Sequence, residues 1–132
     1  MHLLQPSPDI MAEVIEGLKI SVDKAVGLGV SRDKIVIDPG IGFGKNHQEN
    51  LVLLNRLPVL SELNLPLLIG TSRKRFIGAI LDRPVSRRLS GTIASSVAAI
   101  MKGGHILRVH DVAEVKEAAE VADAIVMERL IR

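Results

Sequence analysis

The sequence predicts an α/β fold in which short parallel strands alternate with helices. Three short, mainly aliphatic segments that read as strands begin at residues 35, 67 and 105, and aliphatic runs are typical of strands that are buried on both faces. Each run is followed by a longer stretch with the periodicity of an amphipathic helix. The run starts lie 32 and 38 residues apart, which suits repeated strand–helix units. A parallel sheet covered by helices is therefore expected.

Composition narrows the class of protein. The 132 residues form one domain or part of one, and the chain has two Phe and neither Tyr nor Trp, so its core must be aliphatic. The absence of cysteine excludes disulfides and thiolate metal sites. A net charge of +2 with dispersed basic residues argues against nucleic acid as a partner. No apolar run reaches about 18 residues and no signal peptide is evident, so we expect a cytoplasmic protein that does not span a membrane.

The first part of the chain is expected to contain the end of a strand, one helix and one complete strand. Residues 1–4 form a short apolar run that suits the end of a strand. Ser7 is expected to cap a helix, because a proline and an acid follow it directly. The helix should end near Gly27, and its apolar stripe comprises Ile10, Val14, Leu18 and Val22. The complete strand occupies residues 35–37.

The middle of the chain predicts two more helical segments and a second strand. Asn46 is a candidate cap for a helix marked by leucines, and a short turn follows from Pro58 to Leu63. Residues 67–69 read as a buried strand. A short helix is expected at residues 76–81.

The last part predicts two helices on either side of a third strand. Ser86 or Ser90 begins the first helix, which Gly103 should end. Its inward face is expected to comprise Ile93, Val97, Ile100 and Met101, and close approach is expected at Ala94, Ala98 and Ala99. Residues 105–109 predict the third strand. Asp111 then suits the cap of the final helix.

Polar side chains stand immediately after each predicted strand. In parallel α/β folds, ligands bind outside the carboxyl ends of the strands. Three polar strand ends at the same edge of a sheet therefore predict one site. The residues at these positions are Asp38; Ser72, Arg73 and Lys74; and Arg108, His110 and Asp111.

Two interpretations are open at the first strand end. Asp38 suits a fixed acceptor for N–H donors of a ligand ring, and it equally suits an acid that binds loop amides. Gly40, Gly42 and Gly44 let a backbone approach a ligand, or they simply allow sharp turns. Lys45 reads as a solvated lysine at the end of the loop.

The other two strand ends carry cations. Arg73 and Lys74 stand near a helix N-terminus, where positive charge is unfavourable, and this suggests an anionic partner. Arg108 and His110 point the same way in extended backbone and suit a phosphate or carboxylate group. The alternative for Arg108 is an ion pair with Asp38 or Asp111. We expect Arg75 to face solvent, and structural or exposed positions are expected for His2, His47 and His105.

Four segments together resemble dihydropteroate synthase, a family of pterin-binding enzymes. Their order and spacing are similar to those of the family motifs, and the likeness covers nearly the whole chain. The segments are Ile37–Lys45 (IDPGIGFGK), Gly70–Lys74 (GTSRK), Arg88–Thr92 (RLSGT) and Arg108–Val112 (RVHDV).

This resemblance implies a fold and an activity. Members of the family are (β/α)8 TIM barrels, and residues 1–132 match the carboxy-terminal half, about four βα units. The family is a transferase of folate biosynthesis. It condenses p-aminobenzoate with 6-hydroxymethyl-7,8-dihydropterin pyrophosphate, which gives 7,8-dihydropteroate and pyrophosphate, and it is the target of sulfonamides.

The resemblance also implies a role for individual residues. Asp38 accepts hydrogen bonds from the amino-pyrimidine edge of the pterin. Lys74 contacts the pterin ring and lies beside the aminobenzoate. Phe43 and Ser72 border the aminobenzoate pocket.

The remaining positions complete the implied site. Arg108 and His110 bind the departing pyrophosphate, and Arg108 also stacks on the pterin. Gly70 and Arg73 belong to the substrate-binding set. The residues implied in catalysis are Lys74, Arg108 and His110.

The chain also departs from the family pattern. It is about half as long, so the amino-terminal half of the barrel is missing, and with it the asparagine that helps to hold Mg²⁺. No metal ligand is expected in this chain. A homodimer or pairing with an amino-terminal half-barrel is expected to cover the open edges. Fragment, split-barrel subunit and degenerate paralogue remain open as origins. Alternative functions are a non-catalytic pterin- or anion-binding half-barrel and the pterin-binding domain of a folate-dependent methyltransferase.

Overall fold

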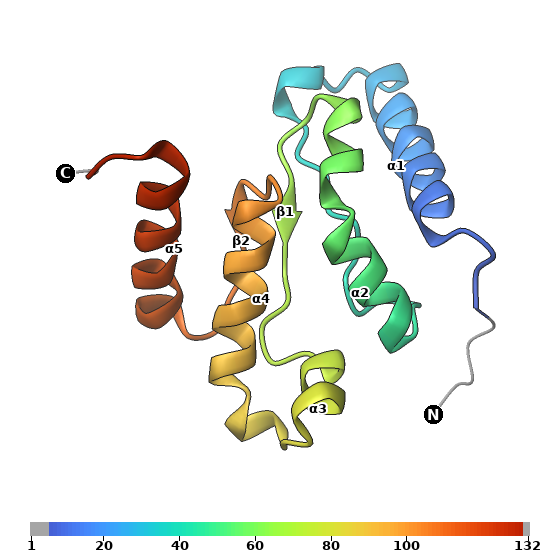
Figure 1. Ribbon diagram of the computed structural model, residues 1–132. Coiled ribbons are helices and arrows are strands. Elements are labelled where there is room, and N and C mark those ends of the chain that lie inside the picture. The colour runs from blue at the N-terminus through green and yellow to red at the C-terminus, as the bar shows by residue number, and fades with distance from the viewer. Residues whose placement is uncertain (1–5, 131–132) are drawn as a thin grey trace.

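Helices surround a short parallel sheet in the computed structural model, which describes residues 6–130. Figure 1 shows the chain advancing sideways, from α1 and α2 on one side, past β1, to α4 and finally α5. The elements in chain order are α1 (Ile10–Gly27), η1 (Arg32–Lys34), α2 (His47–Asn55), η2 (Leu57–Leu63), β1 (Leu68–Ile69), α3 (Arg75–Leu81), η3 (Val85–Arg87), α4 (Leu89–Met101), β2 (Ile106–Leu107) and α5 (Val112–Met127).

Parallel pairing joins the three predicted strand segments in chain order. β1 pairs with β2, with Leu68 opposite Ile106 and Ile69 opposite Leu107. On the other side of β1, Ile37 forms a parallel bridge with Leu67. The three segments therefore end at one edge of the sheet, as the sequence predicts.

The strands are shorter than predicted. The segment at residues 35–37 contributes only the bridge at Ile37, and Val36 is 45% exposed instead of buried. β2 covers two residues of the predicted 105–109, and its Ile106 is also exposed. Both segments have a pairing neighbour on one side only within residues 6–130, so each is an edge strand with half of its backbone groups unpaired in the ladder.

His105 has a structural role at the start of β2. Its Nδ1 accepts a hydrogen bond from the Leu67 N–H at 3.1 Å, while its own backbone N–H donates to the Leu67 carbonyl at 2.9 Å. A side chain thus extends the ladder by one hydrogen bond. This confirms the structural role that was expected for His105.

The first helix begins two residues later than the predicted cap. Asp9, not Ser7, is the N-cap of α1, and its carboxylate accepts a hydrogen bond from the Ala12 N–H at 3.0 Å. The Ser7 N–H instead donates to Glu49 Oε2 at 2.8 Å. An acid at the cap satisfies a free amide and also suits the positive end of the helix dipole. The predicted end at Gly27 is confirmed, and the predicted strand end at residues 1–4 lies outside the described residues.

A capping box starts α2, and it confirms the predicted cap. Asn46 Oδ1 accepts from the Glu49 N–H at 2.8 Å, and Glu49 Oε1 accepts from the Asn46 N–H at 2.9 Å. Because Glu49 also accepts from Ser7, one buried carboxylate ties the start of α2 to the segment before α1. Burial is tolerated since backbone donors satisfy both of its oxygens.

The buried face of α4 differs from the prediction. Thr92, Ser96 and Ala99 are buried, whereas Met101 is 52% exposed and Ala94 and Ala98 are also exposed. Small side chains face inward because α4 ends close to the sheet, where a β-carbon on Gly104 would lie 3.2 Å from Ile69 Cγ1 on β1. The larger aliphatic residues lie at the flanks, where α4 packs against α3 and α5.

The core lies between α1, α2, η2 and the sheet. It is aliphatic apart from Phe76, as the composition predicts. On α5, by contrast, only Val115 and Ala122 are buried, and an apolar face remains exposed at Val112, Val121, Ile125, Val126 and Met127. Within residues 6–130 no helix is long and apolar enough to cross a membrane.

Replacement of Asn46 by Ala should lower the free energy of unfolding by about 1 kcal/mol, because the variant loses a side-chain cap. Urea unfolding of both proteins measures the difference. Gln48→Ala is the control, since Gln48 is exposed on the same helix. Equal midpoints for the two variants would show that the cap contributes nothing.

Candidate functional site

The loop after residue 37 is a compact turn that its own side chains hold together. Gly40, Gly42 and Gly44 have φ of 75°, 85° and 64°, so sharp turning is a confirmed role of these glycines. Asp38 Oδ1 accepts from the Gly40 N–H at 2.8 Å. The amide-binding interpretation of Asp38 is therefore confirmed, and its exposed carboxylate remains accessible to a ligand.

Lys45 closes this loop, contrary to the expectation of a solvated lysine. Its Nζ donates to the carbonyls of Gly40 at 2.8 Å and Phe43 at 2.9 Å, and the residue is partly buried. Burial lowers the pKa of the Lys45 ammonium, while the charges of Glu49, Asp38 and Glu13 act in the opposite direction. The cation is held by the loop that precedes it.

Asn50, which lies on α2, binds the backbone of the same loop. Its Oδ1 accepts a hydrogen bond from the Gly42 N–H at 2.8 Å, and the residue is almost fully buried on α2. Asn50 is a site residue that the sequence did not predict. Its position beside the cap of α2 is a signal only once the loop is known to fold back over that helix.

Lys74 lies between the glycine loop and the end of β1. Its Nζ donates to the Ile41 carbonyl and stands 4.9 Å from the centroid of the Phe43 ring, an arrangement that attracts a cation to an aromatic face. Gly42 leaves room for this side chain, since a β-carbon there would lie 2.8 Å from Lys74 Cδ. Phe43 itself is 69% exposed. It offers an aromatic wall next to the amine.

The charges around Lys74 place the first and third strand ends near the second. Burial is the main cause that lowers the pKa of the Lys74 ammonium. The negative charge of Asp38 raises that pKa, whereas the positive charges of Arg108 and Lys45 lower it further. Three cations and one carboxylate thus share this edge of the sheet, so an anionic group is favoured there.

Gly70 follows β1 directly and lies beside both Lys74 and Arg108. A β-carbon on Gly70 would lie 3.7 Å from Lys74 Nζ and 3.8 Å from Arg108 Cβ. Arg108 is exposed, and no ion pair of its guanidinium is found within residues 6–130. The alternative of an ion pair with Asp38 or Asp111 is therefore wrong, and an exposed guanidinium carries no burial cost.

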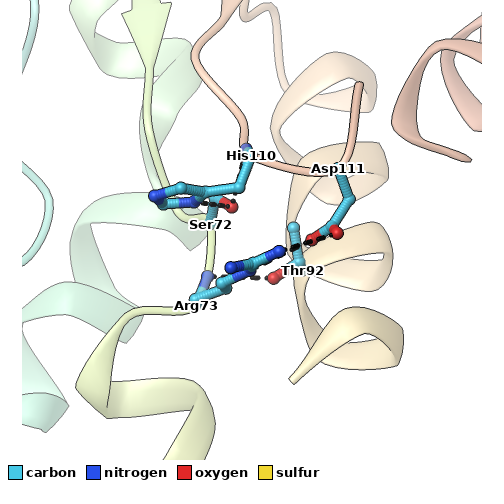
Figure 2. Close-up of polar contacts among 5 residues, drawn as sticks. All are labelled: Ser72, Arg73, Thr92, His110 and Asp111. Atoms are coloured by element: carbon cyan, nitrogen blue, oxygen red, sulfur yellow. Dashed lines mark hydrogen bonds and ion pairs between the residues drawn. The ribbon is translucent and has the colours of Figure 1, made fainter. Parts of the chain in front are cut away.

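Two side-chain pairs connect the loop after β1 to the loop after β2 (Figure 2). Ser72 Oγ lies 2.6 Å from His110 Nδ1, and it accepts from the His110 N–H at 3.1 Å. Arg73 forms a two-pronged ion pair with Asp111, at 3.2 Å from Nε and 2.9 Å from Nη2. The geometry is the fork that arginine makes with carboxylates.

The Arg73–Asp111 pair changes the role that was expected for Asp111. Asp111 occupies the cap position of α5, but its side chain makes no cap hydrogen bond and binds Arg73 instead. The hydrogen bond from Arg73 holds the pKa of Asp111 below its ordinary 3.8, and the same contact raises the pKa of Arg73. Arg73 also has φ 57°, and its N–H donates to Thr92 Oγ1 at 2.9 Å. Thr92 belongs to the RLSGT motif, which gave no role for it in advance.

Residues 6–130 lack a cluster of metal ligands and contain an apolar pocket away from the strand ends. Residues 6–130 contain no group of three or more His, Asp or Glu that could hold a metal ion. An apolar pocket of about 380 Å³ lies elsewhere, between α2, α3 and α4, and is lined by Leu51, Phe76, Ala94 and Lys102 among others. Its walls lack the charged groups of the strand ends.

Comparison with known proteins assigns the family. The family described as pterin binding enzyme matches residues 3–110. The chain belongs to this family. Dihydropteroate synthase of Escherichia coli is 46% identical over 116 residues, which are 88% of this chain and 41% of the relative. The chain thus spans less than half of that enzyme.

Solved structures support the same assignment. Dihydropteroate synthase of Yersinia pestis in a sulfonamide drug complex superposes with a TM-score of 0.94 at 36% identity, over 98% of this chain and 47% of that one. The enzyme of Coxiella burnetii in complex with pteroic acid gives a TM-score of 0.88 at 39% identity, over 92% and 48%. The predicted α/β class and the predicted resemblance to dihydropteroate synthase are confirmed.

Gly42→Ala should expose Lys74, because the added β-carbon collides with the lysine side chain. Labelling of lysines with an amine-reactive reagent, followed by mass spectrometry, should show faster modification of Lys74. Gly44→Ala is the matched control, since Gly44 also has positive φ but its β-carbon would meet nothing within 4 Å. Both variants should lose about 1–2 kcal/mol of stability from the left-handed backbone. Equal Lys74 labelling in both would contradict the contact.

Asp111→Asn should lower stability at neutral pH, with a difference from wild type that vanishes in acid. The pKa of Asp111 is lowered in the folded state, so the ion pair stabilises the fold above about pH 4 and is lost as pH falls through the folded-state value. Unfolding curves between pH 2 and 7 test this expectation. Asp123→Asn, at an exposed site on α5, should show no such pH dependence. A constant difference across the range would rule out the ion pair as its cause.

Proposed function

We propose that this chain is the carboxy-terminal half of a dihydropteroate synthase. The observation that carries the proposal is the meeting of three polar strand ends at one edge of the sheet, where the charges of Asp38 and Arg108 both act on the pKa of Lys74. The relatives named above supply the reaction class, a transferase of folate biosynthesis. In that reaction a C–N bond forms between the amine of p-aminobenzoate and the pterin methylene carbon, while the C–O bond to pyrophosphate breaks.

The proposed fold is half of a (β/α)8 TIM barrel. The superposition covers nearly all of this chain but only 47% of the Yersinia pestis enzyme. The parallel register of Ile37, β1 and β2 also suits consecutive barrel strands. Within the described residues, one side of β2 and one side of the segment at Ile37 are without a ladder partner. Each is an edge that a further strand would extend.

Each end of the proposed substrate fits a different part of the site. Asp38 is exposed and suits the N–H donors of a pterin edge. Phe43 and the Lys74 amine stand side by side, where an aromatic ring and a polar group of the substrate pair would both find a partner. The pteroic acid bound to the Coxiella burnetii relative contains both a pterin and an aminobenzoate, which supports this division.

The catalytic proposal concerns charge on the leaving group. Arg108 and His110 follow β2 and are exposed, so both are available to a pyrophosphate. An Arg fork and an imidazole N–H stabilise the negative charge that develops as the C–O bond breaks. Lys74 adds positive charge beside the amine that attacks. Alignment of the two reactants in a preformed slot lowers the activation barrier further.

Mg²⁺ does not fit the described residues alone. The nearest acid, Asp38, has one oxygen engaged with the Gly40 N–H, and no group of three His, Asp or Glu ligands surrounds it within residues 6–130. A magnesium role would need ligands from outside this chain, as the family resemblance implies. No step in the proposed reaction is assigned to the metal.

The proposed partner is an amino-terminal half-barrel of the same family. It would cover the exposed apolar face of α5 and extend β2, whose Ile106 is 41% exposed. The length missing relative to the relatives, more than half of each, matches what such a half would supply. A second copy of this chain is the competing occupant, and it would give a homodimer in place of a complemented barrel.

A mixture of this chain with a polypeptide that comprises the amino-terminal half of the Escherichia coli enzyme should release pyrophosphate when both substrates are added. The chain alone should bind the pterin without turnover, because it lacks half of the site. Enzymatic detection of pyrophosphate and calorimetric titration measure the two effects. Pterin binding without turnover in the mixture would favour the non-catalytic half-barrel, and absence of binding to folded protein would exclude both functions.

In the complemented enzyme, Lys74→Ala should reduce turnover by about 100-fold. Lys102→Ala is the control, because Lys102 Nζ binds Asn55 Oδ1 on the outer surface and lies away from the strand ends. Equal turnover in the two variants would remove Lys74 from the catalytic set.

A further inference from the structure

We propose that Ser72 is a positioning residue that holds His110 in the tautomer with its proton on Nε2. Two contacts join these residues. Ser72 Oγ lies 2.6 Å from His110 Nδ1, and the same oxygen accepts the His110 backbone N–H at 3.1 Å. One hydroxyl therefore grips both the backbone and the ring of a single histidine.

The direction of the ring contact follows from counting protons. A serine hydroxyl has one proton to donate, and its oxygen already accepts from the His110 N–H. Among the residues described, His110 Nδ1 is the acceptor that stands within hydrogen-bond distance of this hydroxyl. If the ring donated to the second lone pair of Oγ instead, the proton of the buried Ser72 hydroxyl would have no acceptor among the described residues. The proposal therefore has Ser72 donate its proton to Nδ1, which presents a lone pair. A neutral imidazole with a lone pair on Nδ1 carries its proton on Nε2.

The burial of Ser72 favours its contact with the His110 ring over a contact with water. Ser72 is 7% exposed, so water has little access to compete for its hydroxyl. The His110 residue is exposed, and Figure 2 shows the ring nitrogen far from Ser72 pointing away from the Arg73–Asp111 pair. The inner nitrogen is fixed by the protein while the outer N–H remains available.

The neighbouring carboxylate does not compete for the ring. Asp111 follows His110 directly and would otherwise be the obvious acceptor for an imidazole N–H. Arg73 occupies both of its oxygens, at 3.2 Å and 2.9 Å. The two side-chain pairs thus have separate roles. The Arg73–Asp111 pair keeps the carboxylate from accepting a hydrogen bond from the ring, and the Ser72–His110 pair sets the tautomer.

The consequence for ligand binding rests on the proposed function. With its proton on Nε2, His110 presents a donor to an oxyanion without having to be charged. The opposite tautomer would present a lone pair to that oxyanion and repel it. Ser72 would then act on the pyrophosphate through His110, in addition to the place beside the aminobenzoate that the family resemblance implies.

Nuclear magnetic resonance of the ¹⁵N-histidine-labelled chain tests the tautomer without any ligand. At about pH 9, where histidine is ordinarily neutral, wild-type His110 should show one protonated nitrogen, Nε2. Ser72→Ala should give the mixture of tautomers of a solvated imidazole, and Ser72→Thr, which keeps the hydroxyl, should restore the single form. Ser95→Ala is the matched control, because Ser95 Oγ binds Thr71 Oγ1 and not the histidine. An unchanged His110 spectrum in Ser72→Ala would overturn the proposal.

A double-mutant cycle on pyrophosphate affinity tests the consequence in the same chain. Ser72→Ala should weaken binding by about threefold to tenfold, the size of one neutral hydrogen bond. In a His110→Ala background the same substitution should change nothing, because its effect passes through the ring. A loss that persists in that background would show that Ser72 touches the ligand directly, and would contradict the positioning role.

The two proposals fail in different ways. If folded wild-type chain does not bind pyrophosphate, the anion role under the proposed function is wrong, while the ligand-free spectra still decide the tautomer. If pyrophosphate binds but the spectra of wild type and Ser72→Ala agree, the function stands and the tautomer proposal is wrong. Circular dichroism of each variant confirms that the comparison is between folded proteins.

Discussion

The parallel register of three short strand segments is the constraint on which this structure depends. Ile37 bridges to Leu67, and the next two residues, Leu68 and Ile69, pair with β2. Because parallel strands share a direction, this pairing alone places Asp38, Ser72 and Arg108 at one edge of the sheet. The contacts between different strand ends, from the Ser72–His110 pair to the charges around Lys74, follow from that alignment. A shift in register would separate them.

Much of this could be predicted from local sequence, because the signals are local. The cap at Asn46 and the helix end at Gly27 depend on neighbours within a few residues, and both predictions are confirmed. The aliphatic runs predict where the strands lie, but the strands are shorter than expected. The polar residues after the strands were also identified, since strand direction decides where they meet. Long-range pairing was harder. Asp111 suits a helix cap by every local rule, yet Arg73 engages it across the site.

The errors have physical causes in tertiary contacts. Lys45 looks like a solvated lysine until the loop folds back and two carbonyls surround its amine. The buried face of α4 was misplaced because large aliphatic residues were assumed to point inward, whereas the sheet lies close enough to admit only Thr92, Ser96 and Ala99. Asn50 gave no advance signal, because a buried amide is recognisable only through the loop that it binds.

The glycine loop has one more consequence. Asp38, Lys45 and Asn50 bind its backbone groups from within the same 13-residue stretch, so its shape depends largely on its own side chains. A ligand would bind to a loop that is already ordered. The entropy cost of ordering the loop is then part of folding and does not weaken ligand binding. The backbone that carries Phe43 and Asp38 is hydrogen-bonded in its turn conformation without any substrate. An element of this kind favours ligands by fit, and it gives little opportunity for adaptation to a differently shaped ring.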